Sequence, residues 1–486
     1  MRAVMVLFDT LSRRFLEGYG SLDVKTPNFT RLEQHCTTFD HFYSGSLPCM
    51  PARRDLHTGR YNFMHRGWGP LEPFDCSAVQ LLHDTGVYTH LVTDHSHYWE
   101  DGGATYHNRY NTWEGFRGQE GDRWVPQRLS DPTYNTNPLN KKGESAVQHL
   151  ANRTRMETED ELSSVRTINA GLDFLEHYCD TDNWFLQIEC FDPHEPFYVP
   201  EKYRALYGCC APEKAFYWPP YQPSDNLSEA DLQEVRKEYA ALITMCDTHL
   251  GRVLDFMDEH NMWQDTMLIV NTDHGFLLGE HGFMGKNYMP PYEELVHLPF
   301  YLHDPRTQTT GHRESLAQTV DIAPTLLRYF GVESPVEMDG RDLSPLIADD
   351  TAVRDEVLFG LHGGHTCWCD GHYVLLQAPS GENQPLVNYT LMPTNIRGYF
   401  DAATLATAEL VPGSRFTNGV PCLRYIENLA YLQPQRFGTL VFDLKQDPAQ
   451  EHPITDPALT ATLQQKLASA MQAADAPAEE FQRLRL

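Results

Sequence analysis

The sequence predicts an α/β protein with a large mixed, mostly parallel sheet sandwiched by helices. Short apolar runs, typical of buried strands, alternate along the chain with longer segments whose apolar residues recur at helical spacing. This alternation favours parallel strands, because parallel neighbours need a long crossover connection that is usually a helix. With 486 residues, the chain can bury a large core and form more than one domain.

Five short apolar runs are predicted as strands, namely Val4–Phe8, Thr89–Val92, Trp184–Cys190, Met267–Val270 and Phe300–Leu302. Residues 161–178 form a predicted helix with apolar side chains on one face. A second long helix begins at Ser228, a good capping residue, has Asp231 in its first turn and continues to Met257. We expect both apolar stripes to pack in the core rather than to bind a cofactor.

The character of the sequence changes after about residue 355. Strand-like runs joined by turns follow, and residues 457–474 form a predicted closing helix with a proline in its first turn. We therefore expect a larger α/β domain over residues 1–355 and a smaller α+β domain, with a small antiparallel sheet, over residues 356–486. Residues 116–160 are rich in Gly, Pro, Asn and charge, and they are predicted to be a loop-rich insertion.

The charge balance limits the partners of this protein. Lys and Arg number 38 and Asp and Glu 67, so the net charge is −29. A field of this sign repels phosphate backbones, and we expect neither nucleic acid nor an anionic membrane as a partner. The oligomeric state stays open.

Location and thiol chemistry follow from the same composition. No apolar run reaches the length of a membrane span. The apolar run at the start of the sequence is too short for the apolar region of a signal peptide and leads directly into Asp9. We therefore expect a cytoplasmic protein whose eleven cysteines are reduced. Cys367 and Cys369 are predicted to be two partly buried thiols near a turn rather than a metal or redox pair.

Acidic and imidazole side chains follow three of the predicted strands. Asp9 follows the first strand, Asp192 and His194 follow the third, and Asp273 and His274 follow the fourth. Ligands of α/β sheets bind beyond the carboxyl ends of the strands. Carboxylates suit Ca²⁺ or Mg²⁺, whereas a histidine favours Mn²⁺ or Zn²⁺. The sequence therefore predicts a site for one divalent cation at this edge of the sheet.

The most specific motif is C-x-P-x-R, which begins at Cys49 and is followed by Thr58-Gly59-Arg60. It resembles the signature of type I, formylglycine-dependent sulfatases of the alkaline phosphatase superfamily. Other segments resemble this family in the family's own order, namely Phe8-Asp9-Thr10, Thr26–Leu32, Thr93–His97, Phe191–Pro196, Thr272–Gly275, Leu278–Lys286 and Phe442–Pro448. The resemblance thus covers nearly the whole chain.

The resemblance implies that a formylglycine-generating enzyme oxidises Cys49 to formylglycine, whose hydrate is the nucleophile. It also implies that Asp9, Asp273, His274 and the modified Cys49 hold the metal. We expect Ca²⁺ first, with Mn²⁺, Mg²⁺ and Zn²⁺ as alternatives. Arg53 is implied to orient the hydrated aldehyde and to offset its charge.

The resemblance implies roles for three further residues that face the substrate. Lys286 contacts the sulfate group. His194 contacts sulfate or protonates the leaving oxygen, because an imidazole titrates near neutral pH. His97 accepts the proton when sulfate is expelled, and His95 is the alternative for that role.

Three positions depart from the family pattern. Thr10 stands where a second Asp is common, which removes one charge and leaves open whether position 10 binds the metal. Asp94 stands where a Lys is common. Either an Arg or His from the insertion replaces that cation, or Asp94 binds a substrate hydroxyl, with His95 beside it. Ala52 replaces the more frequent Ser, which the family tolerates.

We therefore expect a sulfuric ester hydrolase that releases inorganic sulfate from a small sulfated mono- or oligosaccharide. The sugar part rests on polar and aromatic side chains that could bind hydroxyls and rings, namely Asp94, Glu100, Asp101, Trp68 and Trp99.

Two alternatives stay open. The first is a phosphonate monoester or phosphodiester hydrolase of the same superfamily, which Thr10 and Asp94 favour. The second is a non-catalytic carbohydrate-binding relative. Against it stands the joint retention of Cys49, Arg53, Asp273, His274 and Lys286.

Overall fold

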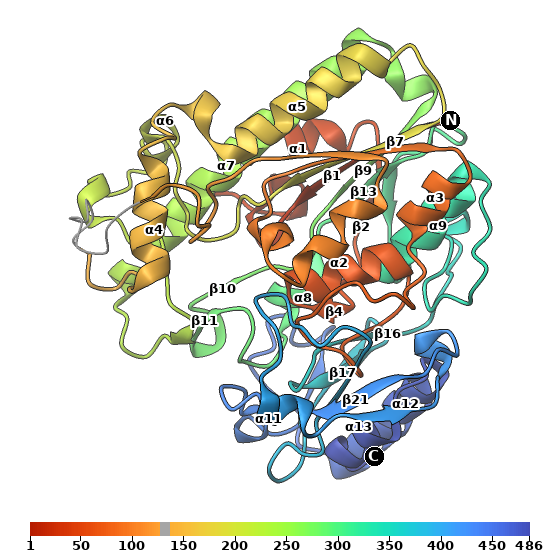
Figure 1. The fold of residues 1–486 in the computed structure, drawn as a ribbon. Coiled ribbons are helices and arrows are strands. Elements are labelled where there is room, and N and C mark those ends of the chain that lie inside the picture. The colour runs from red at the N-terminus through yellow and green to blue at the C-terminus, as the bar shows by residue number, and fades with distance from the viewer. Residues whose placement is uncertain (127–136) are drawn as a thin grey trace.

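The computed structural model describes residues 1–126 and 137–486 (Figure 1). Its largest sheet has eight strands in the order β14-β2-β13-β9-β1-β7-β5-β6. In that order the bounds are Gly311–Arg313, Thr37–Phe39, Tyr301–His303, Thr266–Asn271, Arg2–Phe8, Trp184–Cys190, Tyr88–Thr93 and Thr112–Gly115. Strands β9, β1, β7, β5 and β6 run parallel, and β13 is antiparallel to β9. The predicted mixed, mostly parallel sheet is confirmed, and the five predicted strands lie within one or two residues of those observed.

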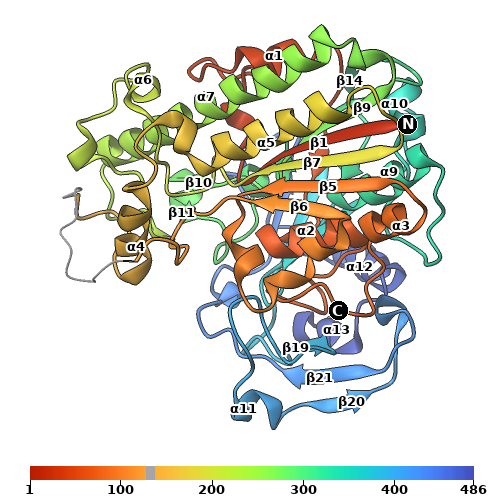
Figure 2. The same ribbon diagram turned by 45° about the horizontal axis from the view of Figure 1, so that its top comes forward.

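Helices cover both faces of this sheet (Figures 1 and 2). On one face lie α1 (Pro27–Leu32), α5 (Ser163–Tyr178) and α7 (Glu229–Glu259), and on the other lie α2 (Cys49–Thr58), α3 (Ala78–Asp84) and α9 (Ile322–Phe330). Side chains of β1 alternate between the two cores and are all buried after its first residue. A strand buried on both faces reads as a continuous apolar run, which is why the sequence reveals it clearly.

The long helix α7 begins as its sequence predicts. The Ser228 side chain accepts a hydrogen bond from the Asp231 amide, and the Asp231 carboxylate accepts one from the Ser228 amide at 2.9 Å. This reciprocal capping satisfies two amides that the helix leaves without partners.

A second sheet has five strands in the order β22-β18-β17-β16-β4. Their bounds are Leu440–Asp443, Tyr373–Gln377, Thr366–Cys369, Val357–Leu361 and Ser46–Leu47. Cys367 and Cys369 lie on β17 as buried free thiols. Strand β4 pairs with β16, so the segment that leads into Cys49 belongs to the sheet of the C-terminal region. The boundary near residue 355 stays a prediction.

The remaining elements cluster around these two sheets. A three-stranded sheet has the order β19-β21-β20, with bounds Val387–Thr390, Cys422–Ile426 and Glu409–Val411. Two more small sheets consist of β10 (Leu277–Leu278), β11 (Phe283–Gly285) and β8 (Gln222–Pro223), and of β12 (His297–Leu298), β3 (Phe42–Tyr43) and β15 (Ala317–Gln318). The remaining helices are α4 (Glu144–Arg153), α6 (Glu201–Arg204), α8 (Glu293–Val296), α10 (Ser344–Asp349), α11 (Ala402–Leu405), α12 (Pro457–Ala473) and α13 (Ala478–Leu484). The predicted closing helix is α12, which packs on the five-stranded sheet.

The predicted insertion over residues 116–160 is not irregular throughout, because it contains the helix α4. Residues 127–136 of this segment lie outside the described residues. Across residues 1–126 and 137–486, none of the helices combines the length and the apolar character that a bilayer crossing requires.

Candidate active site

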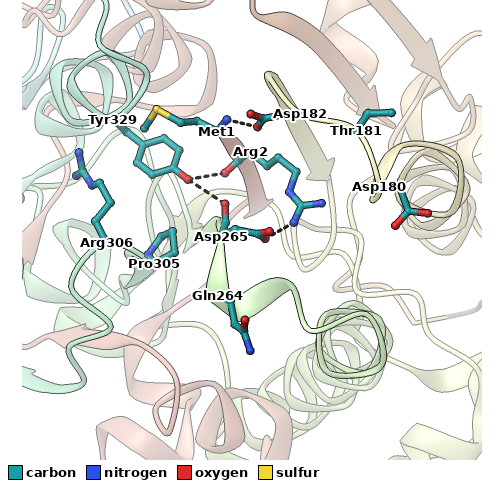
Figure 3. Close-up of a pocket in the computed structure, with 10 residues that line it drawn as sticks. All are labelled: Met1, Arg2, Asp180, Thr181, Asp182, Gln264, Asp265, Pro305, Arg306 and Tyr329. Carbon is teal, nitrogen blue, oxygen red and sulfur yellow. Dashed lines mark hydrogen bonds and ion pairs between the residues drawn. The ribbon is translucent and has the colours of Figure 1, made fainter.

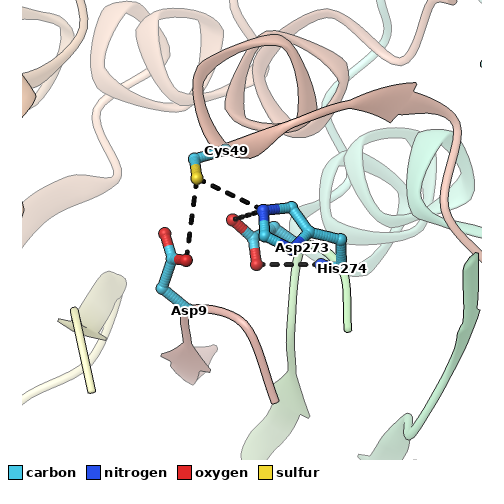
Figure 4. Close-up of side chains that lie close together, drawn as sticks. All are labelled: Asp9, Cys49, Asp273 and His274. Carbon is cyan, nitrogen blue, oxygen red and sulfur yellow. Dashed lines mark hydrogen bonds and ion pairs between the residues drawn. The ribbon is translucent and has the colours of Figure 1, made fainter. Parts of the chain in front are cut away.

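Four side chains from three chain segments meet at the carboxyl ends of the central strands (Figure 4). Asp9 follows β1 directly, Asp273 and His274 follow β9, and Cys49 opens helix α2. The Cys49 sulfur lies 3.2 Å from His274 Nε2 and 3.7 Å from Asp9 Oδ1. All four are buried, and their ligand atoms lie within 4.8 Å of one another. Two carboxylates, an imidazole and position 49 therefore form a donor set that fits one divalent cation.

The loop after β9 is shaped by close backbone packing. A Cβ atom on Gly275 would lie 1.9 Å from the Glu294 carbonyl oxygen, so this position has room only for glycine. The Gly275 amide donates to Leu295 O at 2.9 Å. His274 Nδ1 lies 2.9 Å from Gly275 O, and a donated hydrogen bond there leaves Nε2 free to face Cys49.

Arg53 lies one helical turn after Cys49 and joins three carboxylates. Its guanidinium lies 2.8 Å from Asp9 Oδ2 and 3.1 Å from Glu189 Oε1, and it also bonds Asp273 Oδ2. Burial raises the pKa of Asp9, but Arg53 and other neighbours outweigh burial and hold the pKa well below its usual value. Arg53 therefore favours the ionised form of Asp9, and its guanidinium holds Asp9, Glu189 and Asp273 in place.

Lys286 lies at the base of the site, next to Cys49. Its Nζ is 3.6 Å from the Cys49 sulfur and 3.0 Å from Thr10 Oγ1. Burial lowers the pKa of Lys286, but Cys49, Glu195 and Asp9 outweigh it, so the net shift is upward. Thr10 Oγ1 in turn donates to Asp9 Oδ1 at 2.6 Å, so the threonine connects the lysine to a predicted metal ligand.

His194 and His97 both line the cavity above Cys49. His194 Nδ1 lies 2.6 Å from the backbone oxygen of Glu195, and burial lowers the pKa of the imidazole well below its usual value. His97 Nδ1 lies 2.7 Å from Glu100 Oε2, and its ring packs edge-on against Trp68. In both imidazoles, the contact at Nδ1 fixes the orientation of the ring.

Asp94 and His95 are fully buried and do not line the cavity above Cys49, so the substrate contacts expected of them stay a prediction. His95 is fully buried, and its Nε2 lies 3.4 Å from Asp9 Oδ2. Asp94 accepts hydrogen bonds from Gln119 and Ser164, each at 2.8 Å.

The Asp94 carboxyl also belongs to a buried acidic pair. Ser164 Oγ lies 2.7 Å from Asp192 Oδ2, so it joins Asp94 to Asp192. Burial and the nearby Asp192 raise the pKa of Asp94 to about 7. The Phe191 amide donates to Asp94 at 2.7 Å, so this pair anchors the loop that carries His194.

A cavity of about 490 Å³ opens above Cys49. The insertion contributes Glu120 and Lys141, and the lysine Nζ lies 4.9 Å from the ring centre of Trp218. The insertion therefore supplies a lysine to the cavity, where we expected an Arg or His. Of the predicted sugar-binding aromatics, Trp68 lines the cavity, whereas Trp99 packs against the indole of Trp113.

Sequence reasoning missed several residues of this site. Glu189 lies inside β7, where a single charge among apolar residues was its only signal. Glu195 stands within the segment that we compared with the family, but its role there was not anticipated. The C-terminal region also lines the cavity, with Leu361, His362, Arg397, Glu427, Leu429 and Tyr431.

A second hollow of about 410 Å³ lies at the opposite, amino end of the central strands (Figure 3). Two ion pairs lie in it, Arg2 with Asp265 and the Met1 amine with Asp182. None of the predicted site residues lines this hollow.

Comparison with known proteins identifies the family and several relatives of this chain. Residues 2–332 match the family model described as Sulfatase. The multifunctional alkaline phosphatase superfamily protein PehA of Trinickia caryophylli is 27% identical over 373 residues, which are 67% of this chain and 72% of PehA. The N-acetylglucosamine-6-O-sulfatase of Bacteroides thetaiotaomicron is 22% identical over 407 residues, with 71% of each chain covered.

A solved structure shares the fold. The phosphonate monoester hydrolase of Agrobacterium radiobacter superposes with a TM-score of 0.68 and 17% identity, and the match covers 97% of this chain and 96% of the other.

Proposed function

The chain belongs to the sulfatase family of the alkaline phosphatase superfamily, and on that premise we propose that it releases inorganic sulfate from a sulfated mono- or oligosaccharide. The observation that carries the proposal is the buried cluster at the base of the cavity. There the Cys49 sulfur lies within 3.7 Å of Asp9, His274 and Lys286. We infer from this arrangement that Cys49 is the nucleophile precursor, that Asp9 and His274 belong to the metal-binding set and that Lys286 is a fixed cation beside them.

We propose the following catalytic roles for residues of this chain. Cys49 is the precursor of formylglycine, whose hydrate supplies a hydroxyl nucleophile. Lys286 binds the sulfate oxygens through its ammonium group, which is available at the cavity base. His194 binds sulfate or delivers a proton to the leaving oxygen, and His97 accepts a proton when sulfate is expelled.

The proposed cofactor is one divalent metal, held by Asp9, Asp273, His274 and the modified Cys49. When bound, it supplies positive charge that favours the ionised nucleophile and neutralises sulfate oxygens. We propose Ca²⁺, because carboxylate oxygens dominate the set, with Mn²⁺, Mg²⁺ and Zn²⁺ as alternatives.

A saccharide substrate is supported by the lining of the cavity. Trp68, Trp218 and Tyr221 offer apolar ring surfaces, and Glu427 contributes a carboxylate to the lining of the same cavity. A few polar groups among aromatic side chains are typical of small-molecule sites. The similarity to an N-acetylglucosamine-6-O-sulfatase points the same way.

The second candidate is a phosphonate monoester or phosphodiester hydrolase. Thr10 in place of the common Asp and Asp94 in place of the common Lys favour it, and PehA is described as multifunctional. The non-catalytic alternative is opposed by the complete cluster around Cys49.

The experiment is a substrate panel given to protein matured by a formylglycine-generating enzyme. Sulfated mono- and disaccharides are incubated beside aryl phosphonates and phosphodiesters, and the released sulfate and phosphorus products are quantified by ion chromatography. Sulfate from one or a few sugars supports the proposal. Faster turnover of the phosphorus esters would move the protein to the second candidate.

We also propose that the protein works in the cytoplasm on small sulfated saccharides that have already been imported. Cell fractionation of the native host tests this location, and recovery only from the periplasm or the medium would refute it.

A further inference from the structure

Glu195 is a buried carboxylate at the proposed reaction centre. None of the catalytic or metal-binding roles assigned above involves it. It is 2% exposed, yet it lines the cavity together with Cys49 and Lys286. A negative charge beside a site for an anion is unfavourable, so its presence there calls for a function.

The contacts of Glu195 hold this charge in place. The Tyr221 hydroxyl donates a hydrogen bond to Oε1. The other oxygen, Oε2, lies 3.8 Å from Lys286 Nζ and 3.3 Å from His194 Nδ1. Oε2 has no hydrogen-bond partner among the described residues, so its charge acts on the site mainly through space.

A second carboxylate strengthens the effect. One oxygen of Glu120, from the insertion, lies within 4.8 Å of the ligand atoms of His194 and Glu195. Burial and Glu120 raise the pKa of Glu195 more than Lys286 and the hydrogen bond from Tyr221 lower it, so the net shift is upward. When Glu195 is ionised, its Oε2, 3.8 Å from Lys286 Nζ, offsets part of the positive charge of the lysine.

This offset discriminates between substrates by charge. A sulfate monoester, a phosphate diester and a phosphonate monoester each carry one negative charge on the transferred group. A phosphate monoester carries close to two above its second pKa of about 6. Repulsion by a fixed carboxylate in a low-dielectric site grows in proportion to the charge of the ligand.

We propose that Glu195 is a specificity-determining residue that makes this site select singly charged over doubly charged transferred groups. The inference rests on the proposed function only in placing the transferred group at Cys49 and Lys286. It gives the substrate class as monoanionic esters and excludes phosphate monoesters as good substrates.

The test compares two ligands of similar shape and different charge. Benzenesulfonate carries one negative charge, and phenylphosphonate carries two at about pH 9, well above the second pKa of a phosphoryl group, about 6. Calorimetry measures the Kd of both for the wild type, for Glu195→Gln and for Tyr221→Phe. The second variant is the matched control, because it removes the hydrogen bond and keeps the charge.

We expect Glu195→Gln to tighten phenylphosphonate relative to benzenesulfonate by about tenfold, and we expect Tyr221→Phe to leave the ratio unchanged. Glu120→Gln, at a half-buried position, should shift the ratio in the same direction by a smaller factor. Glu120→Gln therefore keeps the test decisive if Glu195→Gln fails to fold. An unchanged ratio, or a wild type that binds neither ligand, overturns the inference.

Turnover separates this inference from the proposed function. With p-nitrophenyl sulfate and p-nitrophenyl phosphate, the leaving group is constant and only the transferred group changes. A wild type that binds benzenesulfonate but hydrolyses no sulfate ester contradicts the proposed function and leaves the charge selectivity standing.

Discussion

At the scale of single residues, the site depends on the contacts that the Arg53 guanidinium makes with several carboxylates. Its guanidinium contacts Asp9, Asp273 and Glu189 while it is 1% exposed. A planar group with five donors can contact three carboxylates at once, which an ammonium group cannot do in the same geometry. Three acidic groups can therefore be buried together beside the proposed metal.

We predict that Arg53→Lys weakens metal binding and lowers activity about 10–100-fold, because the carboxylates lose their common anchor. Metal titration calorimetry measures the first effect and sulfate release the second. Arg54→Lys is the matched control, since Arg54 is equally buried on α2 but contacts Asn62, Gly67 and Gly69. Metal affinity that is equal in both variants would contradict the role assigned to Arg53.

We predict that Cys49, and not its buried neighbours, carries an aldehyde in protein from the native host. Mass spectrometry of the peptide containing Cys49 should show the mass of formylglycine. The peptides containing Cys36 and Cys190, also buried, should keep their thiols. An active enzyme with Cys49 entirely as thiol, or full activity of Cys49→Ala, would refute the mechanism.

The site residues that belong to recognisable sequence motifs could be predicted from the sequence. The residues that form hydrogen bonds with them could not. Asp9, Cys49, Asp273 and His274 were predicted together and lie together. The partners of Asp94 could not be foreseen, because Gln119, Ser164 and Asp192 come from three separate segments. Hydrogen-bond partners of this kind are fixed by tertiary packing and leave no local pattern.

At the scale of elements, the site is built by the parallel order of β9, β1, β7 and β5. Their adjacent carboxyl ends bring together loops that are far apart in sequence. Their short, continuous apolar runs made these elements predictable. The strand β17 was missed, because its Thr366–Cys369 segment was interpreted as the surroundings of a turn.

We predict that Gly275→Ala destabilises the fold by about 1–3 kcal/mol and lowers metal affinity. The added methyl group would meet the Glu294 carbonyl oxygen, which belongs to the backbone and cannot rotate away, so the loop of His274 must shift. Urea unfolding and metal titration measure the two effects. Gly398→Ala is the control, because nothing lies within 4 Å of its added Cβ. Equal stability of the two variants would refute this packing argument.

At the scale of the whole molecule, the cavity is a joint product of distant parts of the chain. Trp68, Glu120, His194, His362 and Tyr431 all line it. The sequence indicated a C-terminal region with its own sheet, but it held no sign that this region faces the reaction centre. Such contacts depend on how two sheets are oriented, which periodicity does not encode.

The buried acidic pair predicts how global stability depends on pH. The pKa of Asp94 is raised from 3.8 to about 7, so the folded protein holds a proton that the unfolded chain releases. Its contribution to stability is full below about pH 4 and is lost as the pH rises through about 7, at no more than about 1.4 kcal/mol per pH unit.

Asp94→Asn removes this titration. We expect the free energy of unfolding of the wild type to fall relative to that of the variant between about pH 5 and pH 8. Urea unfolding at both pH values measures this difference. Asp23→Asn, at an exposed position, is the control and should show no such trend. A constant difference between the wild type and Asp94→Asn would contradict the raised pKa of Asp94.

The metal dependence of sulfate release by the matured enzyme tests the proposed site most directly. Protein stripped with a chelator is titrated with Ca²⁺, Mn²⁺, Mg²⁺ and Zn²⁺ while bound metal and released sulfate are measured together. We predict that activity returns in proportion to one bound metal per chain, and that Asp273→Asn binds metal far more weakly. Full sulfate release by metal-free protein, or by Asp273→Asn without bound metal, would contradict it.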